Sequence, residues 1–116
     1  MKIWLDDIRN PSYLEGEKDS DWVICRTAEE CIGLLWLNRE PIEWISFDHD
    51  LGEDRGTGYD VAKFLEMMAF VDRQGSGRGM ILYPLKWSIH SANPVGCKNI
   101  QASMEQMKRF LDSRAG

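Results

Sequence analysis

A shortage of positive charge, of cysteine and of long apolar runs excludes several classes of protein. The net charge is −5 at pH 7, which argues against broad nucleic-acid binding and against attachment to anionic membranes. No apolar run approaches the roughly 18 residues of a transmembrane helix, and residues 1–11, MKIWLDDIRNP, lack the features of a signal peptide. The cysteines are Cys25, Cys31 and Cys97, without the CxxC spacing of zinc sites. We therefore expect reduced core thiols and a cytoplasmic protein.

What the sequence contains fits one α/β domain. Its 116 residues, 43% of them hydrophobic, suffice for one core, so we expect a single domain over residues 1–116. Apolar runs alternate with helical patterns, which predicts a parallel sheet with right-handed crossovers. The expected strands lie in KIWLDD, DWVICRT, IEWISFDHDLG and the later half of MILYPLKWSIHS. The expected helices are AEECIGLLWL, opened by a Thr27–Glu30 capping box, YDVAKFLEMMAF, and residues from about 98 to 113.

Glycine and proline mark the connections between these elements. Residues 9–20 contain few apolar side chains, so we expect an irregular connection there without a helix. The glycines of residues 52–58 predict a mobile loop after the third strand, and QGSGRG, residues 74–79, predicts a turn. Pro84 cannot lie inside a central strand, which confines the fourth strand to the residues after it.

Polar side chains follow three of the four expected strands. In a parallel sheet, ligands bind outside the carboxyl ends of the strands. A single acid there is often a helix cap or a solvated loop residue, and a single histidine is often a core residue. Three strand ends that carry such groups together predict a functional site. These residues are Asp6 and Asp7, then Asp48, His49 and Asp50, and finally His90 and Ser91.

Four segments carry a family resemblance, in the order LDDIRNP, RTAEE, FDHDLG and IHSANPVGCKNI. With them the sequence resembles the cyclic-phosphate processing receiver family, an offshoot of response-regulator receiver domains, from Met1 to about Leu111. The resemblance implies a flavodoxin-like or receiver-like three-layer α/β fold with a short parallel sheet of order 2-1-3-4. It also implies chemistry on a cyclic phosphate.

The same resemblance bears on metal binding and on signalling. Receivers hold Mg²⁺ with the acids after the first strand and the central aspartate, which implies Asp6, Asp7 and Asp48 as metal ligands, with Asp50 able to help through water. Receivers also need a lysine after a fifth strand to bind the acyl phosphate, and no such segment follows the last expected helix. We therefore do not expect a phosphorelay switch.

Opening a cyclic phosphodiester requires water to attack phosphorus while the leaving oxygen takes a proton. His49 and His90 are candidates for base and acid, because the ordinary histidine pKa of about 6.5 lies near working pH. Asp48 or Asp50 would orient His49 as the third member of such a site. Strand alternation sends His49 to the face opposite Asp48 and Asp50. We expect the glycine-rich loop to let the strand end bend, so that His49 faces His90 across a cleft.

Four carboxylates at one edge would repel a phosphate, each by roughly 3 kcal/mol at about 5 Å and an effective dielectric near 20. A divalent cation could neutralise them, positive side chains could compensate, or several acids could point elsewhere. The candidate cations are Arg9, Arg55 and Lys86. Arg9, a candidate substrate-binding residue, equally fits a salt bridge to Asp6 or Asp7.

Two further candidates for substrate binding, Ser91 and Asn93, precede the last helix. They and the backbone N–H groups there could bind an anion, or they could form a turn around Pro94 with an N-cap.

The leading hypothesis is therefore a cytoplasmic hydrolase or processing enzyme for a cyclic phosphate on a nucleotide or RNA end. The alternative is a non-catalytic pseudo-receiver that binds a cyclic nucleotide or a protein partner, and a sequestering protein would use the same pocket only to bind. An enzyme of the two-histidine type needs both imidazoles within about 6–8 Å across an open cleft. A binding module could bury one of them.

Overall fold

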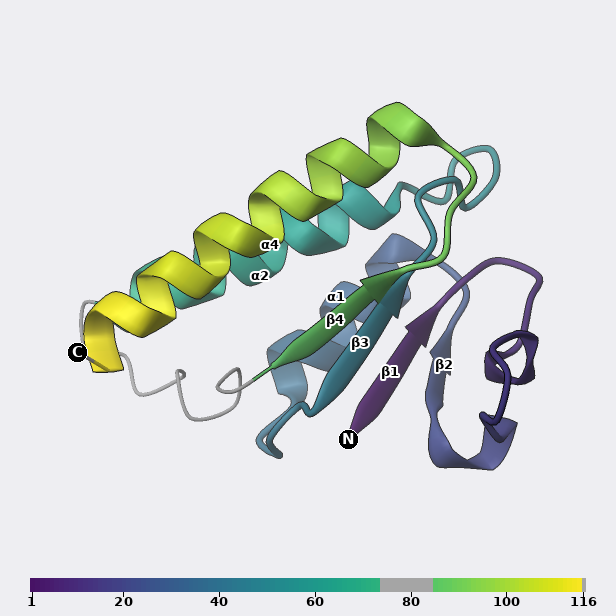
Figure 1. Cartoon of the computed structure of the whole chain (residues 1–116), viewed down its shortest axis with the longest axis horizontal. Coiled ribbons are helices and arrows are strands. Elements are labelled where there is room, and N and C mark those ends of the chain that lie inside the picture. The colour runs from purple at the N-terminus through teal and green to yellow at the C-terminus, as the bar shows by residue number, and fades with distance from the viewer. Residues whose placement is uncertain (74–84, 116) are drawn as a thin grey trace.

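The computed structural model describes residues 1–73 and 85–115. The expected turn at residues 74–79 and Pro84 lie outside the described residues. The strands are β1 (Lys2–Leu5), β2 (Val23–Cys25), β3 (Trp44–Phe47) and β4 (Lys86–Ile89). They form one parallel sheet in the order β2-β1-β3-β4 (Figure 1), which confirms the predicted topology.

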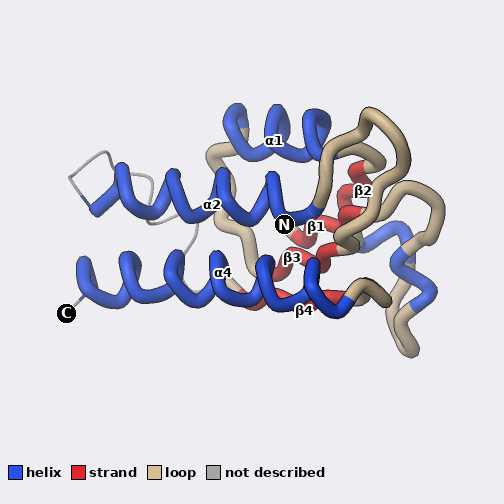
Figure 2. Tube along the Cα trace, turned by 90° about the horizontal axis from the view of Figure 1, so that it is seen from above, coloured by secondary structure: helices blue, strands red, loops and turns tan. Residues whose placement is uncertain are grey.

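In residues 1–73 and 85–115, three α-helices cover one face of this sheet. They are α1 (Ala28–Leu37), α2 (Gly58–Arg73) and α4 (Pro94–Ala115). Ile3 and Leu5 of β1, with Ile45 and Phe47 of β3, are fully buried in one core with these helices. Helices α2 and α4 lie side by side, and α1 lies beside α2 (Figure 2). Among the described residues, no helix is both long and apolar enough to cross a membrane.

The other face of the sheet is covered by the connection between β1 and β2. This connection is mostly irregular, as expected, apart from two single-turn 3-10 helices, η1 (Pro11–Tyr13) and η2 (Asp19–Asp21). Trp4 points into this third layer, where its ring meets Trp22 edge-on at 5.7 Å and its Nε1 donates to Arg9 O at 2.8 Å. Trp22 in turn packs on Trp44, with the ring centroids 4.7 Å apart. On this face, tryptophan rings pack against the sheet where the other face has helices.

The helix starts follow from their caps. Thr27 Oγ1 accepts the N–H of Glu30 at 3.0 Å, as in the expected capping box, whereas the Glu30 carboxylate accepts the N–H of Arg26 at 3.0 Å, one residue before the N-cap. The last helix begins at Pro94, four residues before the expected start at 98. Asn93 caps it by accepting the N–H of Gly96 at 2.9 Å. Proline at the first helical position fits, because that N–H has no helical partner.

The loop after β3 is shorter than expected, because Gly58 begins α2 instead of ending the loop. A Cβ on Gly58 would lie 2.1 Å from the backbone oxygen of Asp48, so only glycine allows this close approach. Gly52 and Gly56 have the positive φ that favours glycine. The chain therefore turns sharply at the carboxyl end of β3.

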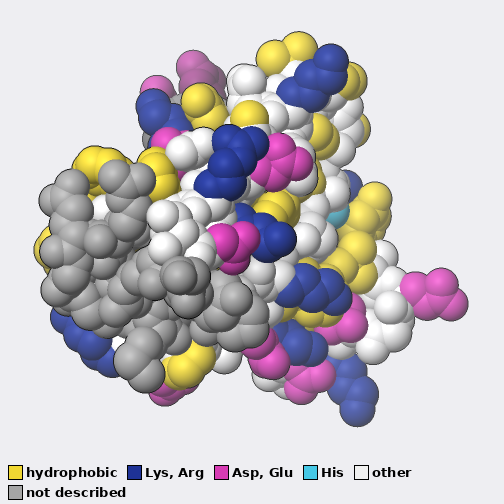
Figure 3. Space-filling model, turned by 60° about the vertical axis from the view of Figure 1, so that its left-hand side comes forward, with side chains coloured by type: hydrophobic (Ala, Val, Ile, Leu, Met, Phe, Trp, Pro, Cys, Tyr) yellow, Lys and Arg dark blue, Asp and Glu magenta, His cyan; other side chains and the backbone are white. Residues whose placement is uncertain are grey.

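The surface and the thiols agree with the composition. Basic and acidic side chains are interspersed on the face shown in Figure 3. All three cysteines are free: Cys25 and Cys31 are buried and Cys97 is partly exposed. Two of the three are therefore the expected core thiols.

Candidate functional site

Three carboxylates meet at the carboxyl edge of the sheet. The register pairs Leu5 with Phe47, so the residues that follow β1 and β3 are neighbours. One oxygen each from Asp6, Asp7 and Asp48 lies within 4.8 Å of the other two. Asp6 and Asp48 are buried, and Asp7 is partly exposed. The structure thus brings together the three acids that the resemblance implies as metal ligands.

Asp6 has every lone pair in use. Its Oδ1 accepts the N–H groups of Ile8 and Arg9, both at 2.9 Å. Its Oδ2 accepts Arg9 Nε at 2.9 Å and His90 Nε2 at 3.0 Å. Burial raises the pKa of Asp6, but the hydrogen bonds from Arg9 and Ile8 outweigh burial and hold the pKa below its ordinary value. Asp6 is therefore an ionised anchor that holds its neighbours in place.

Arg9 is the main neighbour that Asp6 holds. Its guanidinium lies 3.6 Å from Asp48 Oδ2, donates to His90 O at 3.4 Å and stacks 4.7 Å from the Tyr13 ring centroid. Within the described part of the chain, Arg9 Nη1 has no hydrogen-bond partner. The side chain is 32% exposed, so this nitrogen offers two N–H groups to an anion. The salt bridge to Asp6 thus fixes the position of the Arg9 guanidinium and leaves its Nη1 available to a ligand.

The other two candidate cations differ in position. Lys86 lies at the start of β4, where its Nζ sits 3.7 Å from the Trp44 ring centroid. That is the amino end of the strands, so the expectation that Lys86 compensates the acids was wrong. Arg55 and Asp7 both border Gly52, where a Cβ would lie 3.5 Å from Arg55 Cδ and 3.7 Å from Asp7 Oδ2. Arg55 therefore belongs to the surroundings of the acid cluster.

Asp48 is less well compensated than Asp6. Burial and the nearby charge of Asp6 raise its pKa, whereas Arg9 and a hydrogen bond from Ser91 lower it by less. A carboxylate with a raised pKa gains from any further positive charge beside it. A cation at this cluster would therefore stabilise the ionised form of Asp48.

His90 lies inside a one-way chain of hydrogen bonds. Trp44 Nε1 can only donate, and it donates to Ser88 Oγ at 2.9 Å. Ser88 donates to Ser46 Oγ at 2.9 Å, and because the ionised Asp6 carboxylate at Nε2 can only accept, Nδ1 is the acceptor of the Ser46 hydroxyl at 2.8 Å. His90 Nε2 carries the proton and donates it to Asp6. The Asp6 carboxylate thereby fixes the tautomer of His90.

Burial determines the charge of the His90 imidazole. The imidazole stacks on Trp4 with ring centroids 4.0 Å apart, and its side chain is only 4% exposed. Burial lowers the pKa of His90 from 6.5 to about 4, although the charge of Asp6 opposes the shift. His90 is therefore neutral at pH 7.

The order Ser46–His90–Asp6 resembles the triad of a serine hydrolase. However, Ser46 and Asp6 are fully buried, so no substrate carbonyl or phosphate can reach the Ser46 hydroxyl. We interpret the three side chains as a structural array that positions Asp6.

His49 lies on the opposite face of the sheet. A Cβ on Gly96, in the first turn of α4, would lie 2.3 Å from His49 Cγ, so the imidazole packs against that helix. His90 lies on the other face, on Trp4. The expectation that the two imidazoles face each other across a cleft was therefore wrong. The alternation of side chains continues past Phe47 to His49, and the bend at His49 does not turn its imidazole to the face of His90.

A second cluster surrounds His49. Its Nδ1 lies 2.9 Å from Asp50 Oδ1, and this hydrogen bond chiefly lowers the pKa of Asp50. Asn93 Nδ2 donates to both oxygens of Asp50 at 3.3 Å, while Asn93 Oδ1 caps α4. In the described residues, His49 Nε2 has no hydrogen-bond partner. Asp50 therefore orients His49 and favours the tautomer with the proton on Nδ1.

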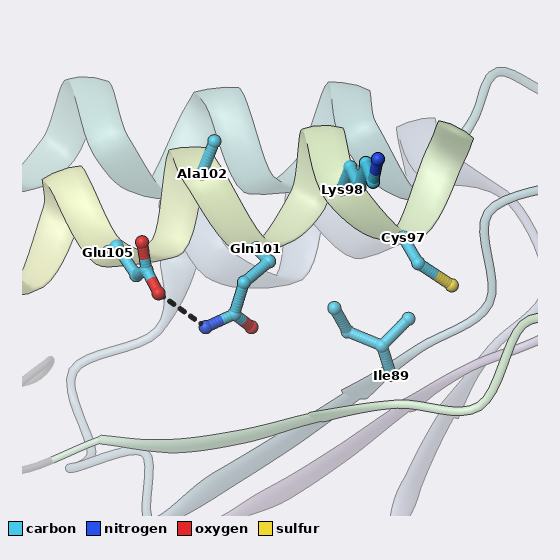
Figure 4. Close-up of a pocket in the computed structure, with 6 residues that line it drawn as sticks. All are labelled: Ile89, Cys97, Lys98, Gln101, Ala102 and Glu105. Carbon is cyan, nitrogen blue, oxygen red and sulfur yellow. Dashed lines mark hydrogen bonds between the residues drawn. The ribbon is translucent and has the colours of Figure 1, made fainter. Parts of the chain in front are cut away.

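The two remaining candidates are occupied by the chain itself. Ser91 Oγ accepts the N–H of Asn93 at 3.1 Å, and Cys97 N donates to Asn93 O at 2.9 Å. The structure thus has the N-cap expected around Pro94, and most N–H groups there already have partners. The groove between β4 and α4, of about 440 Å³, contains none of the candidate site residues (Figure 4). It is lined by Ile89, Cys97, Lys98, Gln101, Ala102 and Glu105.

Sequence reasoning missed Ser46, Tyr13 and Arg26 around the site. Arg26 donates to Arg9 O at 2.7 Å and to Asp6 O at 3.2 Å, which clamps the loop after β1. Ser46 had a usable signal: it is the polar residue in an apolar strand, two positions before Asp48. Arg26 opens the RTAEE segment of the family resemblance, and Tyr13 had no such signal.

Comparison with known proteins agrees with this geometry. A search of curated proteins and a search of solved structures each found no match. The family model described as the cyclic-phosphate processing receiver domain matches residues 1–106. The chain therefore belongs to the cyclic-phosphate processing receiver family.

Proposed function

We propose that this chain binds a cyclic phosphate of a nucleotide or RNA end at the carboxyl edge of the sheet and hydrolyses it. The observation that carries the proposal is the acid cluster of Asp6, Asp7 and Asp48. It lies beside the guanidinium of Arg9, whose Nη1 is available to a ligand. Arg9 Nη1 would donate to a phosphate oxygen, and its fixed position lowers the cost of ordering it. Family membership supports a link to cyclic phosphates.

His49 is the candidate for proton transfer in this proposal, and because it lies on the helix-covered face, the ligand would have to extend from Arg9 across the carboxyl edge of the sheet to reach it. With Nδ1–H donated to Asp50, Nε2 has a lone pair that can take a proton from an attacking water. The water oxygen bonds to phosphorus, the ring P–O bond breaks, and the leaving oxygen takes a proton from solvent water, while the His49 imidazolium later returns its proton to solvent. Asp50 stabilises the imidazolium that forms, as the third member of such sites does. In this proposal the neutral, buried His90 is not the acid, because its Nε2–H is used in the hydrogen bond to Asp6.

The acid cluster also fits a divalent cation. Carboxylate oxygens are the ligands that Mg²⁺ prefers, and the raised pKa of Asp48 marks a site that lacks positive charge. Asp7 and Asp48 would hold the ion directly, because the oxygens of Asp6 are already in use. When bound, Mg²⁺ would polarise the phosphate and offset the charge of the acids.

The test is incubation with 2′,3′-cyclic and 3′,5′-cyclic nucleotides and with ADP-ribose cyclic phosphate, with and without Mg²⁺. His49→Gln should reduce turnover roughly 10²–10⁴-fold. Asp50→Asn should reduce it less, and the double variant should be little worse than His49→Gln, because the two side chains act as a unit. Asp112→Asn, an exposed acid on α4, is the charge-matched control. Turnover that survives His49→Gln unchanged would exclude His49 as the base.

A second candidate function rests on the burial of His90. A module that binds a cyclic nucleotide or a protein partner without turnover can use one histidine as a core residue, as this chain does. Calorimetric binding of a cyclic nucleotide, with no product after prolonged incubation, would favour this candidate over the hydrolase.

A further inference from the structure

An exposed aromatic ring stands beside the acid cluster. Tyr13 is 58% exposed, whereas the other rings of this layer, Trp4 and Trp22, are buried. One side of the Tyr13 ring carries the Arg9 guanidinium at 4.7 Å, and its centroid lies 6.4 Å from that of His90. Arg9 thus connects Tyr13 to Asp48 and the candidate phosphate position.

The backbone segment that carries Tyr13 is fixed by hydrogen bonds. Tyr13 N donates to Asn10 O at 2.9 Å, and Pro11, the first residue of η1, is buried. Arg26 bonds the side chain of Asn10 and the backbone oxygen of Arg9. An exposed tyrosine on a loop would ordinarily lose much freedom when it binds a ligand. Here the backbone is already ordered in the folded chain and the Arg9 guanidinium contacts the ring, which lowers the entropy cost of binding.

We propose that Tyr13 forms a stacking subsite for the nucleobase of the ligand whose cyclic phosphate lies at Arg9 and the acid cluster. The inference rests on the proposed function and narrows its ligand to a cyclic nucleotide with an accessible base. A flat aromatic ring accepts any base, because every base presents a π-face. The subsite therefore favours nucleotides over base-free cyclic phosphates, and it reads no particular base.

The experiment compares two ligands that differ only in the base. They are 2′,3′-cyclic AMP, or 3′,5′-cyclic AMP if only that isomer binds, and the corresponding cyclic phosphate of methyl β-D-ribofuranoside. Titration calorimetry gives the affinity of the wild-type chain for each. Tyr13→Leu should weaken the nucleotide roughly 10- to 100-fold and leave the base-free ligand unchanged. Tyr13→Phe should bind both ligands as the wild type does.

Two controls separate stacking from stability. Trp36→Leu removes an exposed aromatic ring from α1, remote from the acid cluster, and should change neither affinity. Thermal melting of each variant detects loss of fold. If Tyr13→Leu does not fold, Tyr13→Phe still tests the proposal, because it removes only the hydroxyl group. A changed affinity of Tyr13→Phe for either ligand would overturn stacking. An equal loss for both ligands in Tyr13→Leu, or no loss for either, also overturns the subsite. If the wild type binds no cyclic phosphate, the proposed function itself fails.

Discussion

Adding one methyl group to Gly96 should have the opposite effect from adding it to Gly33. Both glycines lie in helices, and neither has a positive φ, so alanine fits both backbones. At Gly33 a new Cβ would meet nothing within 4 Å. At Gly96 it would lie 2.3 Å from His49 Cγ, 2.5 Å from Cδ2 and 2.8 Å from Cβ.

The magnitude follows from these contacts. Gly33→Ala should stabilise the fold by about 0.8–1.0 kcal/mol, the helix-propensity difference. Gly96→Ala must move His49 from 2.3 Å to at least 3.4 Å, where ordinary contact begins. Rotation about the Cα–Cβ bond leaves His49 Cβ in place, so the backbone must shift as well. Such overpacking costs about 1–3 kcal/mol, which places the two variants roughly 2–4 kcal/mol apart.

Urea denaturation of both variants measures this difference. With a slope of about 1–3 kcal/mol per molar urea, the midpoints should differ by on the order of 1 M, with Gly96→Ala the less stable. Gly96→Ala should also change the NMR chemical shifts of the His49 ring, because the ring moves away from Asp50. If Gly96→Ala proved as stable as Gly33→Ala, with unchanged His49 chemical shifts, the placement of His49 against α4 would be refuted.

Three further predictions concern the acid cluster. The pKa of His90 is lowered to about 4 in the folded state, so between about pH 6.5 and 4 only the unfolded chain binds that proton, and stability should fall by roughly 2–3 kcal/mol as the pH drops. Denaturation curves at a series of pH values check this, and a His90→Gln variant with the same pH slope would contradict it. Arg9→Met should destabilise the fold by about 1.5–3 kcal/mol, because buried Asp6 loses a charged partner. Arg9→Lys should recover part of that loss in urea denaturation. Millimolar Mg²⁺ should raise the melting temperature, and Asp7→Asn should remove the effect. A wild-type melting curve indifferent to Mg²⁺ and to chelator would exclude the metal site.

The fold could be predicted from the sequence because its signals are local. Each apolar run of β1 and β3 ends in acids, and the Thr27–Glu30 box marks the start of α1 at the expected residue. The convergence of Asp6 and Asp48 then follows from the parallel register. The start of α4 was missed by four residues because the cap at Asn93 depends on side-chain geometry that spacing does not reveal.

The relation between the histidines was mispredicted for a different reason. Alternation along β3 alone places His49 opposite Asp48, and the structure follows it. We expected a bend because it would bring both histidines into one site, although the alternation of side chains along the strand argued against it. The partners of His90 could not be read at all, because Asp6 lies 84 residues away and Ser46 lies 44 residues away along the chain. Only the assembled sheet brings them together.

The hydrogen-bond chain from Trp44 to Asp6 has a consequence for proton order. Two hydroxyls and an imidazole in a row could point their protons in either direction, and such a row is ordinarily a mixture of both. Here a donor-only indole stands at one end and a carboxylate at the other, so a single arrangement satisfies every member. The row crosses from β4 to β3 and back to the residue after β4, because Ser88 and Ser46 are register partners. The charge of Asp6 at the site is thus coupled to the orientation of the hydroxyl of Ser88, which lies in β4 whereas Asp6 follows β1, and which accepts Trp44 Nε1.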